Sequence, residues 1–217
     1  MTHPLEPLSA TEIQDAVAIF RQAHADEHAV FCSSGLEEPT KSLVKAGAPT
    51  DRVVRLLGTD SVSDGGFEAL VNLTKQQIDR LDRLPSEAQA PYGYKDLGLA
   101  IHLTKNHAQW LDAVKARGIR CDTDEDLARI QIDPWPAGGY PVDQLPKGHR
   151  AVRCIAFLRE DATDNGYARP IHGLICHVDV TDQKVIFVED SGVIPMPPNP
   201  GRFDSAHQER TLSLIHI

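Results

Sequence analysis

The sequence lacks several features that would assign it at once to a class of protein. No stretch approaches the ~18 consecutive apolar residues needed to cross a bilayer, and the amino terminus has neither the basic start nor the apolar core of a secretion signal. The four cysteines form no C-x-x-C pair and are too few for a disulfide framework. We therefore expect a cytoplasmic protein whose cysteines are buried thiols.

Positive charge is also scarce. Lys and Arg number 22 against 31 Asp and Glu, which gives a formal charge of −9, and no run of Lys or Arg offsets it locally. Such a surface repels phosphate backbones and anionic lipids. We therefore expect neither nucleic-acid nor membrane partners.

Familiar catalytic motifs are missing as well. There is no G-x-S-x-G elbow, no glycine-rich phosphate loop and no S-x-x-K. Among ten histidines, His24 and His28 are four apart at the end of a polar helix, a spacing more typical of a solvated face than of a metal site. From local sequence alone, Trp135 and Tyr167 are large rings beside loops, and we expect them to pack over a sheet edge rather than to contact a ligand. The residues alone predict no catalytic residue and no metal ligand.

What is present is the composition of an ordinary folded protein: 217 residues, 41% hydrophobic and 24% charged. A first helix is expected from Ser9 to His28, with Ser9 and Glu12 as a capping box. Three extended segments follow at Ala29–Cys32, Arg52–Leu57 and Phe67–Leu73. Lys75–Leu84 could be a strand or a short helix. A domain boundary is expected at Pro85–Pro91, which is rich in Pro, Ala and Ser.

The second half repeats this order of helix and then strands. Two helices are expected at Leu97–His102 and Ala108–Ala116, a shaped loop at Asp133–Tyr140, and three strands at Arg150–Arg159, Arg169–Val180 and Lys184–Val188. A turn at Asn165-Gly166 would bring Cys154 and Cys176 nearly opposite one another, so a disulfide is conceivable, although thiols are favoured. The fold class predicted is α+β, with two small domains, each a helix packed on a short antiparallel sheet.

Several motifs in this second half resemble a known family. Asp164–Leu174 reads Asp-Asn-Gly-Tyr-Ala-Arg-Pro-Ile-His-Gly-Leu and is followed by Val178-Asp179-Val180. This resembles the third amino-terminal domain of copper amine oxidases, in which a D-N-x-Y-A-R-P-I-x-G-L run precedes a V-D-x strand end. Matches also occur at His3–Leu8 with Glu12-Ile13, at Glu38-Pro39-x-Lys41 and at Asp133–Gly138. The resemblance runs from His3 to about Pro200.

The resemblance implies an enzyme that oxidises primary amines to aldehydes with oxygen, releasing ammonia and hydrogen peroxide. It implies a homodimer with copper and topaquinone as cofactors, because a quinone supplies the electron sink that protein side chains lack. It also implies the boundaries: residues 1–88 as the family's second domain, 92–204 as its third, both resembling the cystatin fold, and 205–217 as a tail. By the same similarity Trp135 and Tyr167 occupy the wall of the substrate channel.

The sequence lacks the motifs that carry catalysis and copper binding in the family. It has no H-x-H copper pair and no Asn-Tyr-Asp or Asn-Tyr-Glu around a cofactor tyrosine. No catalytic or metal residue can therefore be carried over, and the expectation is an inactive amino-terminal fragment whose missing partner is the catalytic domain. Leu212–Ile217, written back as CTG TCT CTT ATA CAC ATC, spells a transposase end used in sequencing libraries, so 212–217 are expected to be an adapter-encoded artefact. The alternative is a stand-alone cystatin-like binding module without catalysis.

Overall fold

The computed structural model describes residues 3–24, 26, 28–60, 66–85, 88–138, 143–146, 148–161 and 164–198. The chain forms two compact units, Met1–Tyr94 (unit 1) and Lys95–Ile217 (unit 2). The predicted tail at 205–217 lies outside the described residues. In the described part of the chain, none of the helices has both the length and the apolar character that crossing a membrane requires.

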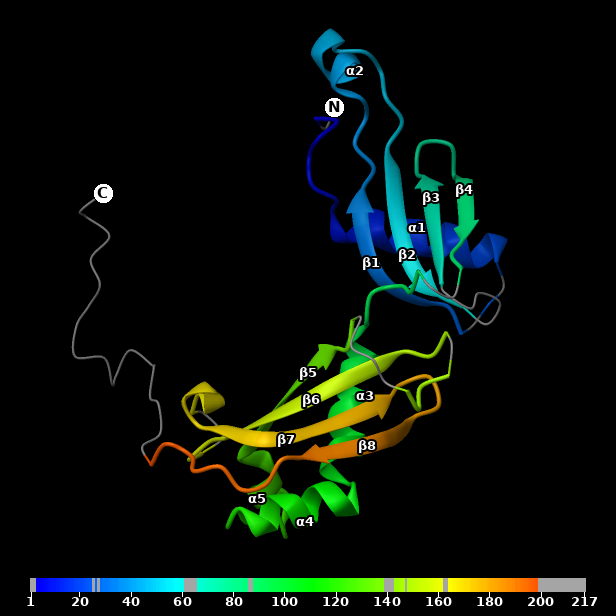
Figure 1. The fold of residues 1–217 in the computed structure, drawn as a ribbon. Coiled ribbons are helices and arrows are strands. Elements are labelled where there is room, and N and C mark those ends of the chain that lie inside the picture. The colour runs from blue at the N-terminus through cyan, green and yellow to red at the C-terminus, as the bar shows by residue number, and fades with distance from the viewer. Residues whose placement is uncertain are drawn as a thin grey trace, which may run out of the picture. The chain divides into compact units, whose positions relative to one another are not determined.

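Unit 1 is a four-stranded antiparallel sheet with one long helix across it (Figure 1). Its elements are α1 (Ala10–Ala23), β1 (Val30–Leu36), α2 (Lys41–Ala46), β2 (Val53–Thr59), β3 (Phe67–Asn72) and β4 (Gln77–Arg83), and the strand order follows the sequence. Phe20 of α1 stacks on Phe67 at 4.7 Å between ring centroids and meets Phe31 edge-on at 5.3 Å. These rings, with alternate residues of β2 and β3 such as Val54 and Ala69, form the core between helix and sheet.

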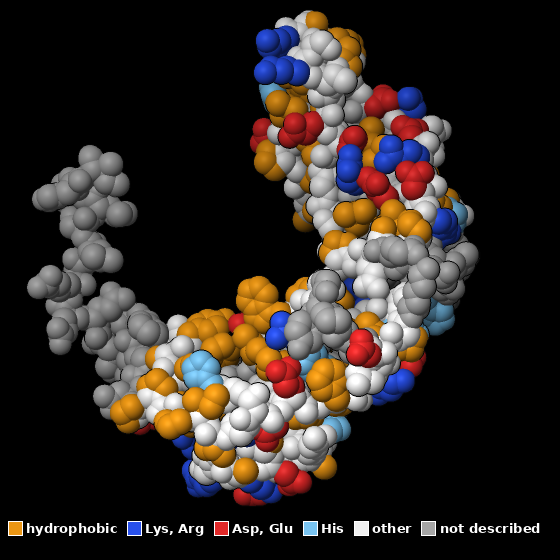
Figure 2. Space-filling view, in the orientation of Figure 1, with side chains coloured by type: hydrophobic (Ala, Val, Ile, Leu, Met, Phe, Trp, Pro, Cys, Tyr) orange, Lys and Arg blue, Asp and Glu red, His pale blue; other side chains and the backbone are white. Residues whose placement is uncertain are grey.

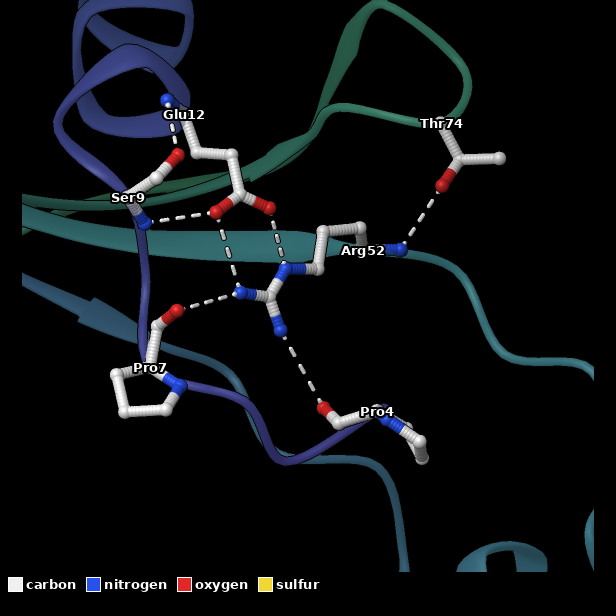
Figure 3. A network of polar contacts seen from close by, with 6 residues as sticks. All are labelled: Pro4, Pro7, Ser9, Glu12, Arg52 and Thr74. Atoms are coloured by element: carbon white, nitrogen blue, oxygen red, sulfur yellow. Dashed lines mark hydrogen bonds and ion pairs between the residues drawn. The ribbon is translucent and has the colours of Figure 1, made fainter. Parts of the chain in front are cut away.

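The start of α1 is held by a polar network that reaches across unit 1 (Figure 3). Ser9 and Glu12 form the predicted capping box, in which each side chain accepts the other's backbone N–H. Arg52, just before β2, donates to both Glu12 oxygens at 2.6 and 3.2 Å, and also to the carbonyls of Pro4 and Pro7. This guanidinium is the largest of the influences that lower the pKa of Glu12 to about 2.

Unit 2 has the same plan with more helix. Its elements are α3 (Tyr94–Lys105), α4 (Ala108–Ala116), α5 (Asp124–Ala128), β5 (Ile130–Pro136), β6 (Ala151–Leu158), the 3-10 turn η1 (Gly166–Ala168), β7 (Pro170–Asp179) and β8 (Lys184–Asp190). The sheet order is β5-β6-β7-β8, again antiparallel throughout. Figure 1 shows α3 crossing one face of this sheet.

The core of unit 2 contains Trp110, its largest fully buried side chain, together with two cysteines and a threonine. Cys154 and Cys176 are Cα partners on β6 and β7, as the turn at Asn165-Gly166 predicted, and both are free, buried thiols. Burial raises the pKa of Cys154 to about 12 and that of Cys176 to about 11. Thr104 of α3, fully buried, donates to the Ala100 carbonyl at 2.8 Å, which satisfies its hydroxyl within the helix.

The structure confirms the α+β class and two helix-on-sheet units, and it settles the open segment 75–84 as strand β4. Two expectations are wrong. The segment Asp133–Tyr140 is not wholly a loop, because Asp133–Pro136 completes the edge strand β5, where a proline is tolerated since one side of the strand needs no partner. Helix α1 ends at Ala23, so His24 and His28 do not share a helical face.

Candidate functional site

The two residues that the family resemblance singles out, Trp135 and Tyr167, lie together around one carboxylate. Asp133 and Trp135 are two apart on β5 and so point to the same face of the sheet. Asp133 Oδ2 accepts from Tyr167 Oη at 2.9 Å and from Trp135 Nε1 at 3.4 Å. The resemblance pointed to the two rings but not to Asp133, because Pro134 and Pro136 indicate a loop and hide the strand that places Asp133 beside Trp135.

Tyr167 is positioned by the turn that carries it. The side chain of Asn165 accepts from the Tyr167 backbone N–H at 3.0 Å and so caps η1. The ring meets Phe157 of β6 edge-on at 4.9 Å. Asp133, as hydrogen-bond acceptor and as negative charge, raises the pKa of Tyr167, so the phenol stays neutral at physiological pH. Trp135 and Tyr167 remain 57% and 55% exposed, and their faces are available for contact.

The same face of the sheet continues across β6, β7 and β8 with side chains of mixed character, because Arg153 and Glu189 lie on it beside aliphatic and aromatic residues. Ile155 and Ile175 are half-buried Cα partners there. His177 stacks on Phe187 at 4.1 Å between centroids, and its Nε2 lies 3.3 Å from Glu189 Oε2. Burial lowers the pKa of His177, which favours the neutral ring. This face therefore combines aliphatic and aromatic side chains with charged ones.

A second cluster lies at the turn between β7 and β8. Within the described residues, His149, Asp179 and Asp182 are the one group of three side chains that could hold a metal ion. His149 Nδ1 lies 2.8 Å from Asp179 Oδ2 and 3.8 Å from Asp182 Oδ2. The buried Asp179 also accepts from the backbone N–H groups of Thr181 and Asp182. A metal ion would have to replace the bond between His149 and Asp179.

Unit 1 has the same turn with different side chains. Asn72 there accepts from the Lys75 backbone N–H and donates to Asp51 at 3.0 Å, and Lys75 Nζ pairs with Asp51 at 2.6 Å. The corresponding residues in unit 2 are Asp179, Asp182 and His149. The matching contacts indicate that the two units share one type of turn, and we call the unit 2 cluster of His149, Asp179 and Asp182 the turn lock.

Comparisons with known proteins give a consistent result. The family model described as "Copper amine oxidase, N3 domain" matches residues 95–205. The chain is 31% identical over 204 residues to a primary amine oxidase of Arthrobacter sp. (strain P1), covering 94% of this chain and 30% of that protein. It is 30% identical over 206 residues to a histamine oxidase of Arthrobacter globiformis, covering 93% and 29% respectively.

A solved structure supports the fold. A copper-containing benzylamine oxidase from Hansenula polymorpha superimposes with a TM-score of 0.69 at 16% identity, over 98% of this chain and 35% of the other. The present chain thus spans about a third or less of the length of the proteins it matches.

The family uses copper and topaquinone, and the residues described here do not fit either group. A copper site of the expected kind needs three converging histidines, whereas the described cluster of three offers one imidazole and two carboxylates. Tyr167 is held in a hairpin turn by Asn165, with its hydroxyl bound to Asp133. With the matches covering more than half of the chain, these 217 residues belong to the copper amine oxidase family and correspond to its amino-terminal domains, without the catalytic domain.

Proposed function

We propose that this chain is the amino-terminal part of a copper- and topaquinone-dependent primary-amine oxidase, which converts amines to aldehydes, ammonia and hydrogen peroxide. The observation that carries the proposal is the alignment with amine oxidases over more than nine-tenths of the chain. The 217 residues contribute scaffolding and substrate access, since the copper ligands and the quinone precursor are not among them. On its own the chain is inactive.

Within that enzyme, the cluster of Asp133, Trp135 and Tyr167 forms part of the wall along which the amine travels. Two exposed rings fixed by one shared acceptor give a rigid apolar surface, and such surfaces guide the apolar body of a substrate at little entropic cost. The neutral phenol of Tyr167 does not compete with the catalytic groups for the amine's proton.

The remaining parts of the proposal come from the resemblance and the composition. The full-length enzyme is a cytoplasmic homodimer that takes a primary amine and oxygen as substrates. It has no nucleic-acid or membrane partner, in keeping with the formal charge of −9.

The first test is the native gene together with the activity of the isolated chain. We expect the genomic reading frame to continue beyond codon 204 into an H-x-H strand and an Asn-Tyr-Asp or Asn-Tyr-Glu tyrosine. We expect the purified 217-residue chain, given copper and a primary amine, to release no hydrogen peroxide. A stop codon directly after Ile217 in the genome would instead favour a stand-alone binding module, and peroxide from the isolated chain would contradict its inactivity.

The second test addresses the channel wall in the full-length oxidase. Trp135→Ala and Tyr167→Ala remove apolar contact surface, so we expect KM for an aromatic amine to rise about three- to tenfold with kcat nearly unchanged. Tyr167→Phe keeps the ring and loses only the bond to Asp133, so its effect should be smaller. Tyr94→Phe is the matched control, since Tyr94 is 92% exposed. Unchanged KM in both alanine variants would remove these residues from the channel.

A further inference from the structure

The outer face of the sheet in unit 1 carries a ladder of alternating charge that runs from the end of β1 to β4. Glu37 follows β1, Arg55 lies on β2, Glu68 on β3, and Arg80 and Asp82 on β4. Arg55 lies 2.6 Å from Glu37 and 3.0 Å from Glu68. Arg80 lies 3.5 Å from the same Glu68 and 2.8 Å from Asp82. Figure 2 shows acidic and basic side chains intermingled on unit 1.

This ladder ends on an edge strand. β4 pairs with β3 on one side, and no strand of the described chain pairs with it on the other. An edge strand offers backbone donors and acceptors to another strand, and charged side chains on it disfavour pairing unless the charges that meet are opposite. Arg80 and Asp82 are 48% and 51% exposed, so both can reach a partner beyond the edge.

The charge order on β4 is complementary to itself. Residues 79–83 read Asp-Arg-Leu-Asp-Arg, so a second β4 running antiparallel about a twofold axis at Leu81 sets each Arg80 opposite an Asp82 of the other copy. Asp79 and Arg83 are engaged within the chain, Asp79 with Asn72 and Arg83 with Asp60, so the facing pairs between copies are those of Arg80 and Asp82. Opposite charges directly across antiparallel strands attract, and the ladder then continues from one sheet into the next without a break in alternation.

The helix side of the same strand also leaves room for a partner. A groove of about 610 Å³ lies between the carboxyl-terminal half of α1 and β4. Its lining combines four apolar residues with six polar or charged ones: Ile19, Ala23, Ile78 and Leu81, and Gln22, His24, Gln76, Gln77, Asp79 and Arg80. Ile78 and Leu81 are only half-buried against the core of unit 1. A strand added beside β4 would cover these apolar side chains on one face while the charges pair on the other.

From these observations we propose that β4 of unit 1 is a self-association surface, through which two copies of this chain join their sheets into one of eight strands. The partner is a second copy, in the antiparallel register centred on Leu81. This inference is independent of the proposed oxidase function, because it concerns unit 1 alone and needs no catalytic domain.

The experiment measures association of the full 217-residue chain by sedimentation velocity over a range of concentrations. We expect a reversible dimer of the 23.8 kDa chain, with a dissociation constant on the order of micromolar, as for other small interfaces. Amide hydrogen exchange should show protection of residues 77–83 that increases with concentration. A monomer at every concentration would overturn the proposal.

Charge reversals at Arg80 and Asp82 test the facing pairs between two copies. Arg80→Asp alone and Asp82→Arg alone each set like charges opposite one another, so each should raise the dissociation constant at least about tenfold. Mixing the two single variants restores both attractions in a mixed dimer, and the double variant Arg80→Asp/Asp82→Arg restores them within one species. A mixture that fails to associate would refute the register.

A matched control uses the other end of the ladder. Glu37→Arg changes the charge by the same amount beside Arg55 and far from the β4 edge, so dimerisation should persist. Thermal unfolding of every variant checks that unit 1 is folded. Loss of the dimer in Glu37→Arg, with unit 1 still folded, would show that overall charge and not facing pairs governs association, and this too would overturn the proposal.

Discussion

In units 1 and 2, corresponding residues join the covering helix, the second strand and the last turn of the sheet. An arginine directly before the second strand, Arg52 or Arg150, pairs with an acidic residue in the first turn of the covering helix, Glu12 or Asp96. The backbone N–H of each arginine donates to a threonine in the last turn of the sheet, Thr74 at 2.9 Å and Thr181 at 3.0 Å. Gln76 and Gln183 close these turns with φ of 55° and 54°.

The units differ in what they place on the sheet face away from the helix. Unit 1 carries the charge ladder from Glu37 to Asp82, whereas unit 2 carries exposed rings and half-buried aliphatic side chains around Trp135 and Tyr167. Since the framework is common, the outer faces are free to diverge. A charged face selects partners by charge, whereas exposed rings such as Trp135 and Tyr167 offer a partner apolar contact area.

The largest expected effect tests whether the two cores are separate. Phe20→Ala removes the ring that Phe31 and Phe67 pack against, and should cost unit 1 about 3–5 kcal/mol. Both tryptophans, Trp110 and Trp135, lie in unit 2, so fluorescence reports on that unit while circular dichroism reports on both. We expect the dichroism transition in urea to shift to lower concentration and the fluorescence transition to stay in place.

The control for this variant is Leu43→Ala, because Leu43 is 42% exposed on α2 and its removal should change stability by less than about 0.5 kcal/mol. A fluorescence transition that moves together with the dichroism transition in Phe20→Ala would mean that the units unfold as one. Units 1 and 2 would then not be independently stable.

Substitutions in the turn lock test whether the last turns of the two sheets are equivalent. His149→Asp sets a second carboxylate against the buried Asp179 and should cost about 2–3 kcal/mol in the free energy of unfolding. Adding Asp179→Asn and Asp182→Lys installs the residues of unit 1, and the triple variant should return to within about 1 kcal/mol of the original chain. Urea unfolding followed by fluorescence measures both.

A triple variant no more stable than His149→Asp would show that the two turns are not equivalent. So would a saturable stabilisation of the original chain by zinc ions that the triple variant loses, since the cluster would then act as a metal site. The variant Asp143→Asn, which changes a carboxylate outside the lock, serves as the control for altered charge.

Particular residues show which features of the fold could be predicted from the sequence. The capping box at Ser9 and Glu12 depends on local spacing, and it was predictable. The placement of Cys154 opposite Cys176 on neighbouring strands depends on the position of the turn, and it was predictable too. Strand β5 was not, because Pro134 and Pro136 indicate a loop unless the strand is known to lie at an edge. The Arg52–Glu12 pair joins residues 40 apart, and no local pattern reports such a contact.

In the candidate site, too, some residues could be identified from the sequence, but their contacts could not. Trp135 and Tyr167 were singled out by resemblance, but their common acceptor Asp133 emerged only when strand and turn were placed together. The turn lock was likewise hidden, since its residues His149 and Asp179 lie 30 apart. Long-range pairs of this kind are set by strand register, which depends on the whole sheet.

The smallest expected effect concerns the charge at the start of α1. Arg52 and the Ser9 backbone hold the pKa of Glu12 at about 2, below its ordinary 4.5, so its ionised form stabilises the folded state. This contribution is fully present above pH 4.5 and is lost as the pH falls toward 2. Glu12→Gln keeps the capping box but not the charge, and should cost about 1–2 kcal/mol at neutral pH, since the pair is partly exposed.

The distinguishing measurement is therefore the pH profile of unit 1 unfolding, followed by circular dichroism. The difference between the original chain and Glu12→Gln should shrink between pH 4.5 and 2, whereas Asp15→Asn, an exposed change on the same helix, should leave the profile nearly parallel. A constant difference at all pH values would mean that Arg52 stabilises α1 through its bonds to the Pro4 and Pro7 carbonyls alone. The shared arginine–acid pairing of the two units would then be a matter of geometry and not of charge.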